Sequence, residues 1–156
     1  MGEDDRLSIR MAQRADAHAI YAIHRASLIT LCATHYSREQ LQCVFASKTV
    51  EGYYEAIDRA EMFVCGRDSQ IAGFGHAIPG EVVAIFVHPD VVRQGIGSKL
   101  LKHAIQCARY EHTGPVKVIA TLNAQSFYER HGFLEISRYA LLCGDIKFPV
   151  VEMTFP

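Results

Sequence analysis

The sequence lacks the features of a membrane protein, a metal site or a disulfide scaffold. It has no tryptophan, and its 5 cysteines are widely spaced without a Cys-x-x-Cys pair, which predicts neither a zinc site nor a disulfide framework. No apolar run approaches the roughly 20 residues that span a bilayer, and the acidic start MGEDDR has no signal-peptide pattern. We therefore expect reduced, mostly buried cysteines in a cytoplasmic protein that binds no membrane and no metal.

Charge is nearly balanced along the chain, which argues against a nucleic-acid-binding surface. The 16 Lys and Arg residues stand against 17 Asp and Glu residues, and the basic residues do not cluster. Hydrophobic residues make up 49% of the 156 residues, enough to build one buried core. With no linker in sight, this predicts a single domain over residues 1–156.

Hydrophobic periodicity predicts a chain that mixes strands and helices. Short apolar runs predict strands, and apolar residues at helical spacing predict helices. The predicted strands are 7–11, 62–67, 70–78, 82–87, 116–120, 133–142 and 148–155. The predicted helices are 17–33, 38–46, 52–59, 95–111 and 123–132. This order indicates an α/β fold of the mixed α+β type, with helices on both faces of one sheet.

A glycine turn follows the apolar strand Val82–Val87, in the segment HPDVVRQGIGSKLL. Gly95 and Gly97 lie where this loop becomes a helix, and the first amides of a helix are unpaired at the positive end of its dipole. Such an end binds phosphate, and Arg93 adds a positive charge. Taken alone, the two glycines are more typical of a tight joint that packs a helix onto a sheet.

A second motif, NAQSFYERHGF, follows the predicted strand 116–120. Asn123 is expected to cap the helix, and Tyr128 lies inside it. A phenol has a reference pKa of about 10, so at neutral pH it can donate a proton to a departing thiolate. Alternatively, Tyr128 is a packing residue and Asn123 only a helix cap.

The two motifs, in this order, resemble the GNAT superfamily of N-acetyltransferases. The resemblance implies a twisted, mostly antiparallel sheet of about seven strands, with acetyl-coenzyme A as cosubstrate and a possible homodimer. It also implies that strand 82–87 bulges and splays from its neighbour. The coenzyme diphosphate would contact Arg93, Gln94, Gly95, Ile96, Gly97 and Ser98. The pantetheine arm would pair with Ile85, Phe86 and Val87 and touch Asn123, with Tyr128 as the general acid.

The activity implied is direct transfer of acetyl to a primary amine of a small molecule or peptide in one ternary complex. One departure is Val92, which stands where family members commonly carry Arg or Gln. A non-catalytic acyl-coenzyme A sensor and a plain interaction domain therefore remain as alternatives.

Candidates for the general base are Glu81, at the start of the central strand, and His76, in the preceding one. Histidine titrates near pH ~6.5, which suits a base, although Glu81 could be a solvated strand-end charge and His76 a partly buried histidine with a local partner. By the resemblance, His35 and Tyr36 line the acceptor pocket; otherwise they belong to an ordinary polar loop. No cysteine lies in either motif, which argues against a covalent acetyl-cysteine route. The identity of the amine is not readable from the sequence.

Overall fold

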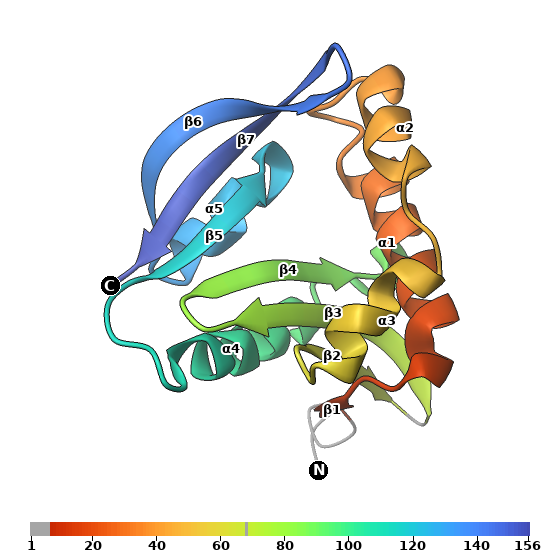
Figure 1. Cartoon of the computed structure of the whole chain (residues 1–156), viewed down its shortest axis with the longest axis vertical. Coiled ribbons are helices and arrows are strands. Elements are labelled where there is room, and N and C mark those ends of the chain that lie inside the picture. The colour runs from red at the N-terminus through yellow and green to blue at the C-terminus, as the bar shows by residue number, and fades with distance from the viewer. Residues whose placement is uncertain (1–6, 68) are drawn as a thin grey trace.

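One twisted sheet organises the computed structural model, which describes residues 7–67 and 69–156 (Figure 1). Its seven strands lie in the order β1-β2-β3-β4-β5-β7-β6. Their bounds are β1 Ser8–Met11, β2 Met62–Arg67, β3 Gln70–Ile78, β4 Glu81–Val87, β5 Val116–Thr121, β6 Leu134–Cys143 and β7 Ile146–Phe155. All described neighbours pair antiparallel except β4 and β5, which are parallel. The predicted fold class is confirmed.

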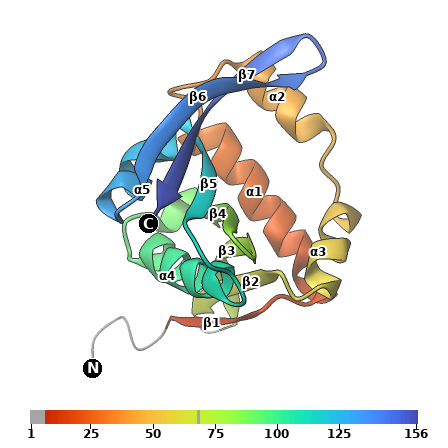
Figure 2. The same cartoon turned by 60° about the vertical axis from the view of Figure 1, so that its left-hand side comes forward.

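Helices cover both faces of the sheet, as the alternation of elements predicts. Figure 2 shows α1 (Ala17–Leu31), α2 (Arg38–Ala46) and α3 (Tyr54–Asp58) on one side. On the other side lie α4 (Ile96–Arg109) and α5 (Gln125–Arg130). Each face has its own core because the central strands are apolar on both sides: Phe63 packs toward α4, whereas Phe74 packs toward α1.

The central strand β4 bulges and then separates from β5, as the resemblance implies. The register with β3 shifts between His76, opposite Ala84, and Ala77, opposite Val82, so that Val83 is an extra residue. Pairing with β5 is limited to Glu81 and Val82. Beyond Val82 the β5-facing edge of β4 therefore has no described strand beside it.

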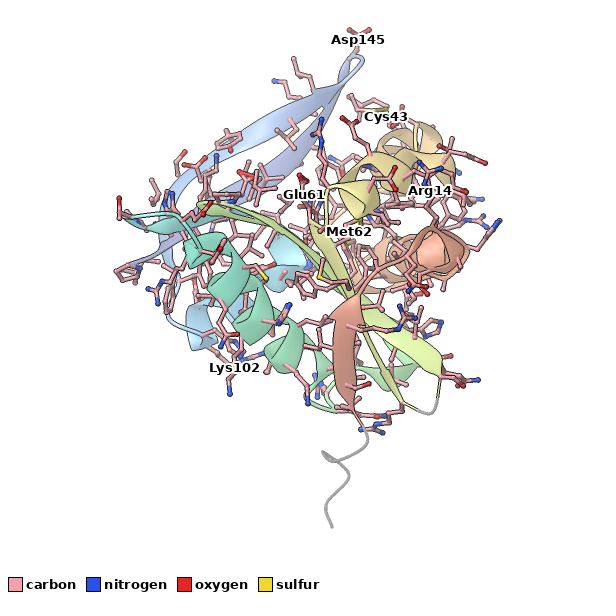
Figure 3. The ribbon with its side chains drawn as sticks, turned by 60° about the horizontal axis from the view of Figure 1, so that its bottom comes forward. Arg14, Cys43, Glu61, Met62, Lys102 and Asp145 are labelled. Atoms are coloured by element: carbon pink, nitrogen blue, oxygen red, sulfur yellow. A yellow bond between two sulfur atoms is a disulfide. The ribbon has the colours of Figure 1, made fainter. Side chains whose placement is uncertain are left out.

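The expectation that no disulfide forms is wrong. Cys43 of α2 is bonded to Cys143 at the end of β6, with a Cα–Cα distance of 6.2 Å (Figure 3 labels Cys43). The partners are 100 residues apart in the sequence, so spacing gave no sign of the bond. Cys32 and Cys65 are free and buried, as expected. Within the described part of the chain, no helix is both long and apolar enough to cross a bilayer.

Candidate active site

The predicted phosphate turn is present at the start of α4. Gly95 is the N-cap residue, and its φ of +83° is a left-handed conformation that favours glycine. Without a side chain, it donates or accepts no side-chain capping hydrogen bond to the first turn of α4. The first helical bond runs from the Lys99 amide to the Gly95 carbonyl. The amides of residues 96–98 are therefore left without an acceptor inside the helix. A Cβ built on Gly95 would meet nothing within 4 Å, so a ligand can approach the backbone there.

A groove of about 560 Å³, called groove 1 below, runs from this turn along β4 to α5. Eight of the ten predicted coenzyme-binding residues line it: Ile85, Phe86, Val87, Arg93, Gly95, Gly97, Ser98 and Asn123. The other two do not. The Gln94 side chain accepts a hydrogen bond from Arg67, and the Ile96 side chain is buried in the core, so that only its backbone faces the turn.

The prediction that Asn123 caps α5 is wrong. The N-cap residue of α5 is Ala124, and Asn123 lies inside the 3₁₀ turn Leu122–Ala124. Its Oδ1 atom is buried, and among the described residues it has no hydrogen-bond partner. Buried polar atoms without partners are rare, and one in a groove indicates a ligand donor. This atom, the open turn and the Arg93 and Arg130 guanidiniums fit the amides and diphosphate of coenzyme A.

His131 and Ser98 are groove residues whose connection the sequence did not reveal. The His131 Nδ1 lies 2.8 Å from the Phe127 carbonyl, and Nε2 lies 3.0 Å from the Ser98 hydroxyl. The carbonyl can only accept, so Nδ1 carries the proton and Nε2 accepts from the hydroxyl. This pair ties α5 to the first turn of α4 and so joins the two sequence motifs.

Cys32 also lines groove 1, although it lies outside both motifs. The residue is only 1% exposed, and burial raises the pKa of its thiol to about 11, partly offset by hydrogen bonds from the Thr121 and Asn123 side chains. Because the thiolate is the nucleophile, a thiol with this pKa is inert at neutral pH. This burial argues further against an acetyl-cysteine route, whose absence stays a prediction.

Tyr128 lies beneath groove 1 and does not line it. It is 4% exposed and packs edge-on between Phe127 and Phe133, at centroid distances of 5.2 and 5.3 Å. Burial raises the pKa of its hydroxyl, so the phenol stays protonated at neutral pH, as a general acid requires. Its role as proton donor stays a prediction.

A second cavity of about 570 Å³, called groove 2, lies under α1, the α2–α3 segment and the β6–β7 hairpin. Its walls are mostly apolar and aromatic. They include His24, Tyr53, Phe74, Phe86 and Phe148. Phe86 and Thr121 line both grooves, so the two cavities meet where β4 and β5 separate.

The two candidate bases lie in different places. His76 lines groove 2 beside the β4 bulge, and its Nε2 donates to Glu61 Oε1 over 2.9 Å. Glu81 forms an ion pair of 3.2 Å with Lys117, and among the residues described as lining the two grooves it does not occur. The structure thus places His76 in the lining of groove 2 and leaves Glu81 out of the described lining of both grooves.

His35 and Tyr36, predicted to line the acceptor pocket, do not occur in the described lining of groove 2. His35 lines groove 1, not groove 2. Tyr36 is buried and stacks on Phe148 at a centroid distance of 4.1 Å; its hydroxyl donates to the Pro149 carbonyl and accepts from the Leu122 amide. Tyr36 therefore links the end of α1 to β7 and to the 3₁₀ turn at Leu122 by packing and hydrogen bonds.

Comparison with known proteins agrees with this geometry. Residues 32–141 match the family described as "Acetyltransferase (GNAT) domain", which covers more than half of the chain. The chain belongs to the GNAT acetyltransferase family. It is accordingly an acetyl-coenzyme A-dependent acyltransferase, since its curated relatives are named as N-acetyltransferases.

Two relatives and one solved structure illustrate the similarity. The chain is 26% identical to "Uncharacterized N-acetyltransferase YafP" of Escherichia coli (strain K12), covering 96% of this chain and 95% of that protein. It is 26% identical to "Peptidyl-lysine N-acetyltransferase YjaB" of Salmonella typhimurium, covering 96% and 99%. The fold matches the PaiA N-acetyltransferase of Thermoplasma acidophilum, solved with coenzyme A, at TM-score 0.77, 20% identity and coverage of 96% and 98%.

Proposed function

We propose that this GNAT protein transfers acetyl from acetyl-coenzyme A directly to a primary amine of a small molecule or peptide, within one ternary complex. One observation carries the proposal: two separate grooves meet at Phe86 and Thr121, where β4 leaves β5. Two substrates can thus approach each other without a covalent enzyme intermediate. The PaiA structure of the same fold was solved with coenzyme A, which supports coenzyme binding by this fold.

Acetyl-coenzyme A, when bound, supplies an activated thioester and leaves as a free thiol. The unpaired amides of residues 96–98 and the Arg93 and Arg130 guanidiniums would hold its diphosphate. The free edge of β4 from Ile85 to Val87 offers backbone groups for a strand-like contact with the arm. An amide on the same edge, near Val87, would stabilise the developing oxyanion.

His76 would accept the proton of the amine. Because its Nε2–H donates to Glu61, the neutral ring presents Nδ1 as a base, and the carboxylate stabilises the imidazolium that forms. Glu61 acts as a positioning residue. Tyr128 Oη would donate a proton to the departing sulfur, which requires a small shift of the Phe127–Tyr128 layer toward groove 1.

The direct test combines binding and turnover. Acetyl-coenzyme A should raise the melting temperature, and an amine panel should release free thiol with a saturable rate. Tyr128→Phe should lower kcat about 100-fold and leave coenzyme affinity nearly unchanged. Binding without thiol release from any amine would support the non-catalytic sensor instead. Turnover unchanged in Tyr128→Phe would remove that residue from its role.

Self-association is a further part of the proposal. The edge strand β6 exposes Leu134, Ile136 and Leu142 to 63%, 58% and 73%. An edge with exposed apolar side chains favours pairing with another chain. A homodimer through β6 should appear in analytical ultracentrifugation, and Ile136→Lys should convert it to monomer.

A further inference from the structure

Groove 2 is built to receive a flat apolar group. Phe74 and Phe86 stack at a centroid distance of 5.6 Å, and the His24 ring lies 4.4 Å from that of Phe86. Tyr53 and Phe148 complete the aromatic lining. Aromatic walls recognise aromatic or large apolar ligands, and a cavity of about 570 Å³ suits a small molecule.

The polar groups inside groove 2 are mostly paired with each other. His24 Nδ1 and Tyr53 Oη are hydrogen-bonded over 2.8 Å, and His76 bonds to Glu61. Burial and the nearby Lys48 charge lower the pKa of His24 to about 4, so this ring is neutral at physiological pH. Neither His24 nor Tyr53 therefore offers a charge to a ligand.

Lys48, just after α2, is the exception. It lines groove 2, and among the described residues its ammonium has no ion-pair partner. None of the described residues that line the groove is Asp or Glu; the Glu61 carboxylate pairs with the lining residue His76. The lining of groove 2 thus combines one positive charge without a described ion-pair partner and a base–carboxylate pair.

We propose, resting on the acetyltransferase function above, that the acceptor is a primary amine that carries both an aromatic ring and a carboxylate, in the class of the aromatic α-amino acids. The amine would lie toward His76 and the carboxylate, on the same carbon, toward Lys48, with the ring between the aromatic walls. This arrangement pairs each polar part of the ligand and buries its apolar part. A polyamine or a lysine side chain would leave Lys48 facing a like charge or nothing.

The experiment uses four acceptors with the intact protein and acetyl-coenzyme A. They are L-phenylalanine, 2-phenylethylamine (the same ring and amine without the carboxylate), spermidine and a lysine-containing peptide. We expect kcat/KM for L-phenylalanine to exceed that for 2-phenylethylamine about 10-fold, mainly through KM, because the charge pair with Lys48 is lost. Spermidine and the peptide should be poorer still.

The variant Lys48→Gln separates charge recognition from folding. It should raise KM for L-phenylalanine about 10-fold and leave KM for 2-phenylethylamine unchanged. The matched control is Lys102→Gln, an exposed lysine on α4 that lies away from Glu61 (Figure 3) and should alter neither value. Equal loss for both acceptors in Lys48→Gln would overturn the role of Lys48.

The two proposals fail in different ways. If spermidine or the peptide is the best acceptor, the aromatic class is wrong while acetyl transfer stands. If no amine releases thiol although acetyl-coenzyme A binds, the transferase proposal falls. In that case calorimetric titration of L-phenylalanine against 2-phenylethylamine still tests groove 2, and equal or absent binding overturns the inference.

Discussion

Groove 1 and groove 2 meet at the same two residues but are built differently. Much of groove 1 comes from two short segments, 85–98 and 121–131, and the unpaired amides at the start of α4 lie in the first of them. Groove 2 draws side chains from positions between His24 and Val150, spread over helices and strands of the whole chain. A ligand bound by backbone leaves a local pattern of glycines, whereas a ligand bound by side chains leaves none.

The grooves also differ in charge. Arg93, Arg130 and the free end of α4 make groove 1 positive, which suits a diphosphate. Groove 2 is aromatic, with Lys48 as an isolated cation. This difference predicts that a change in one groove should leave the binding of the other groove's substrate unchanged.

The largest effect is expected from the disulfide, which joins α2 to the β6–β7 hairpin, two walls of groove 2. Reduction should lower the free energy of unfolding by about 4–5 kcal/mol, since the bond closes a loop of about 100 residues. It should also raise the acceptor KM and leave coenzyme affinity unchanged. Urea unfolding with and without reductant measures the change in the free energy of unfolding. The variant Cys43→Ser is the control, because its urea midpoint should not respond to reductant. Identical midpoints for the oxidised and the fully reduced protein would contradict a stabilising role of the disulfide.

Acid should weaken the fold through His24. Its folded-state pKa, about 4, lies below the reference of about 6.5, so as pH falls the unfolded state binds the proton first. Stability is therefore full above pH ~6.5 and falls by up to about 3 kcal/mol toward pH ~4. Urea midpoints over this range should show a slope that His24→Gln reduces and that His18→Gln, on the exposed side of α1, retains.

Replacing the base tests the junction itself. His76→Gln should lower kcat about 100-fold with the dissociation constant for acetyl-coenzyme A unchanged, because the imidazole lies in groove 2. Glu81→Gln, outside both grooves and paired with Lys117, should keep kcat within a factor of two. The opposite ranking in steady-state kinetics would make Glu81 the base.

Gly95→Ala should weaken coenzyme binding about 10-fold, because a left-handed φ costs a Cβ-bearing residue roughly 1–2 kcal/mol and the turn would relax. Gly144→Ala is the matched control: its φ is +60° and its Cβ also meets nothing within 4 Å, but it lies in the β6–β7 turn. Both variants should lose similar stability. Calorimetric titration that shows equal coenzyme affinity for both would contradict the turn's role.

The smallest effect is expected from Cys32→Ala, which should change kcat less than about twofold. Its thiol is buried and protonated, so it takes no part in acetyl transfer. Mass spectrometry should accordingly detect no acetylated protein during turnover. A large loss of kcat, with an acetylated wild-type species, would restore the covalent route.

Much of the fold was predictable from local patterns. The helix at 38–46 and the strands at 62–67 and 70–78 have the bounds that periodicity and capping predict. The prediction of Asn123 as the cap of α5 was wrong because a 3₁₀ turn precedes the helix. Asparagine is compatible with a helix cap and with a 3₁₀ turn, so the sequence does not distinguish the two. The homodimer and the cytoplasmic location stay predictions.

Local patterns predicted the order of strands and helices and the glycine turn, because periodicity and backbone geometry are local properties. The coenzyme-binding positions came from the family resemblance and stay predictions. Only in the folded structure do we see the disulfide, the Ser98–His131 contact, the position of His76 beside Glu61 and the aromatic lining around Lys48. Those depend on side chains from distant segments, and nothing in local chemistry specifies which of them will face one another.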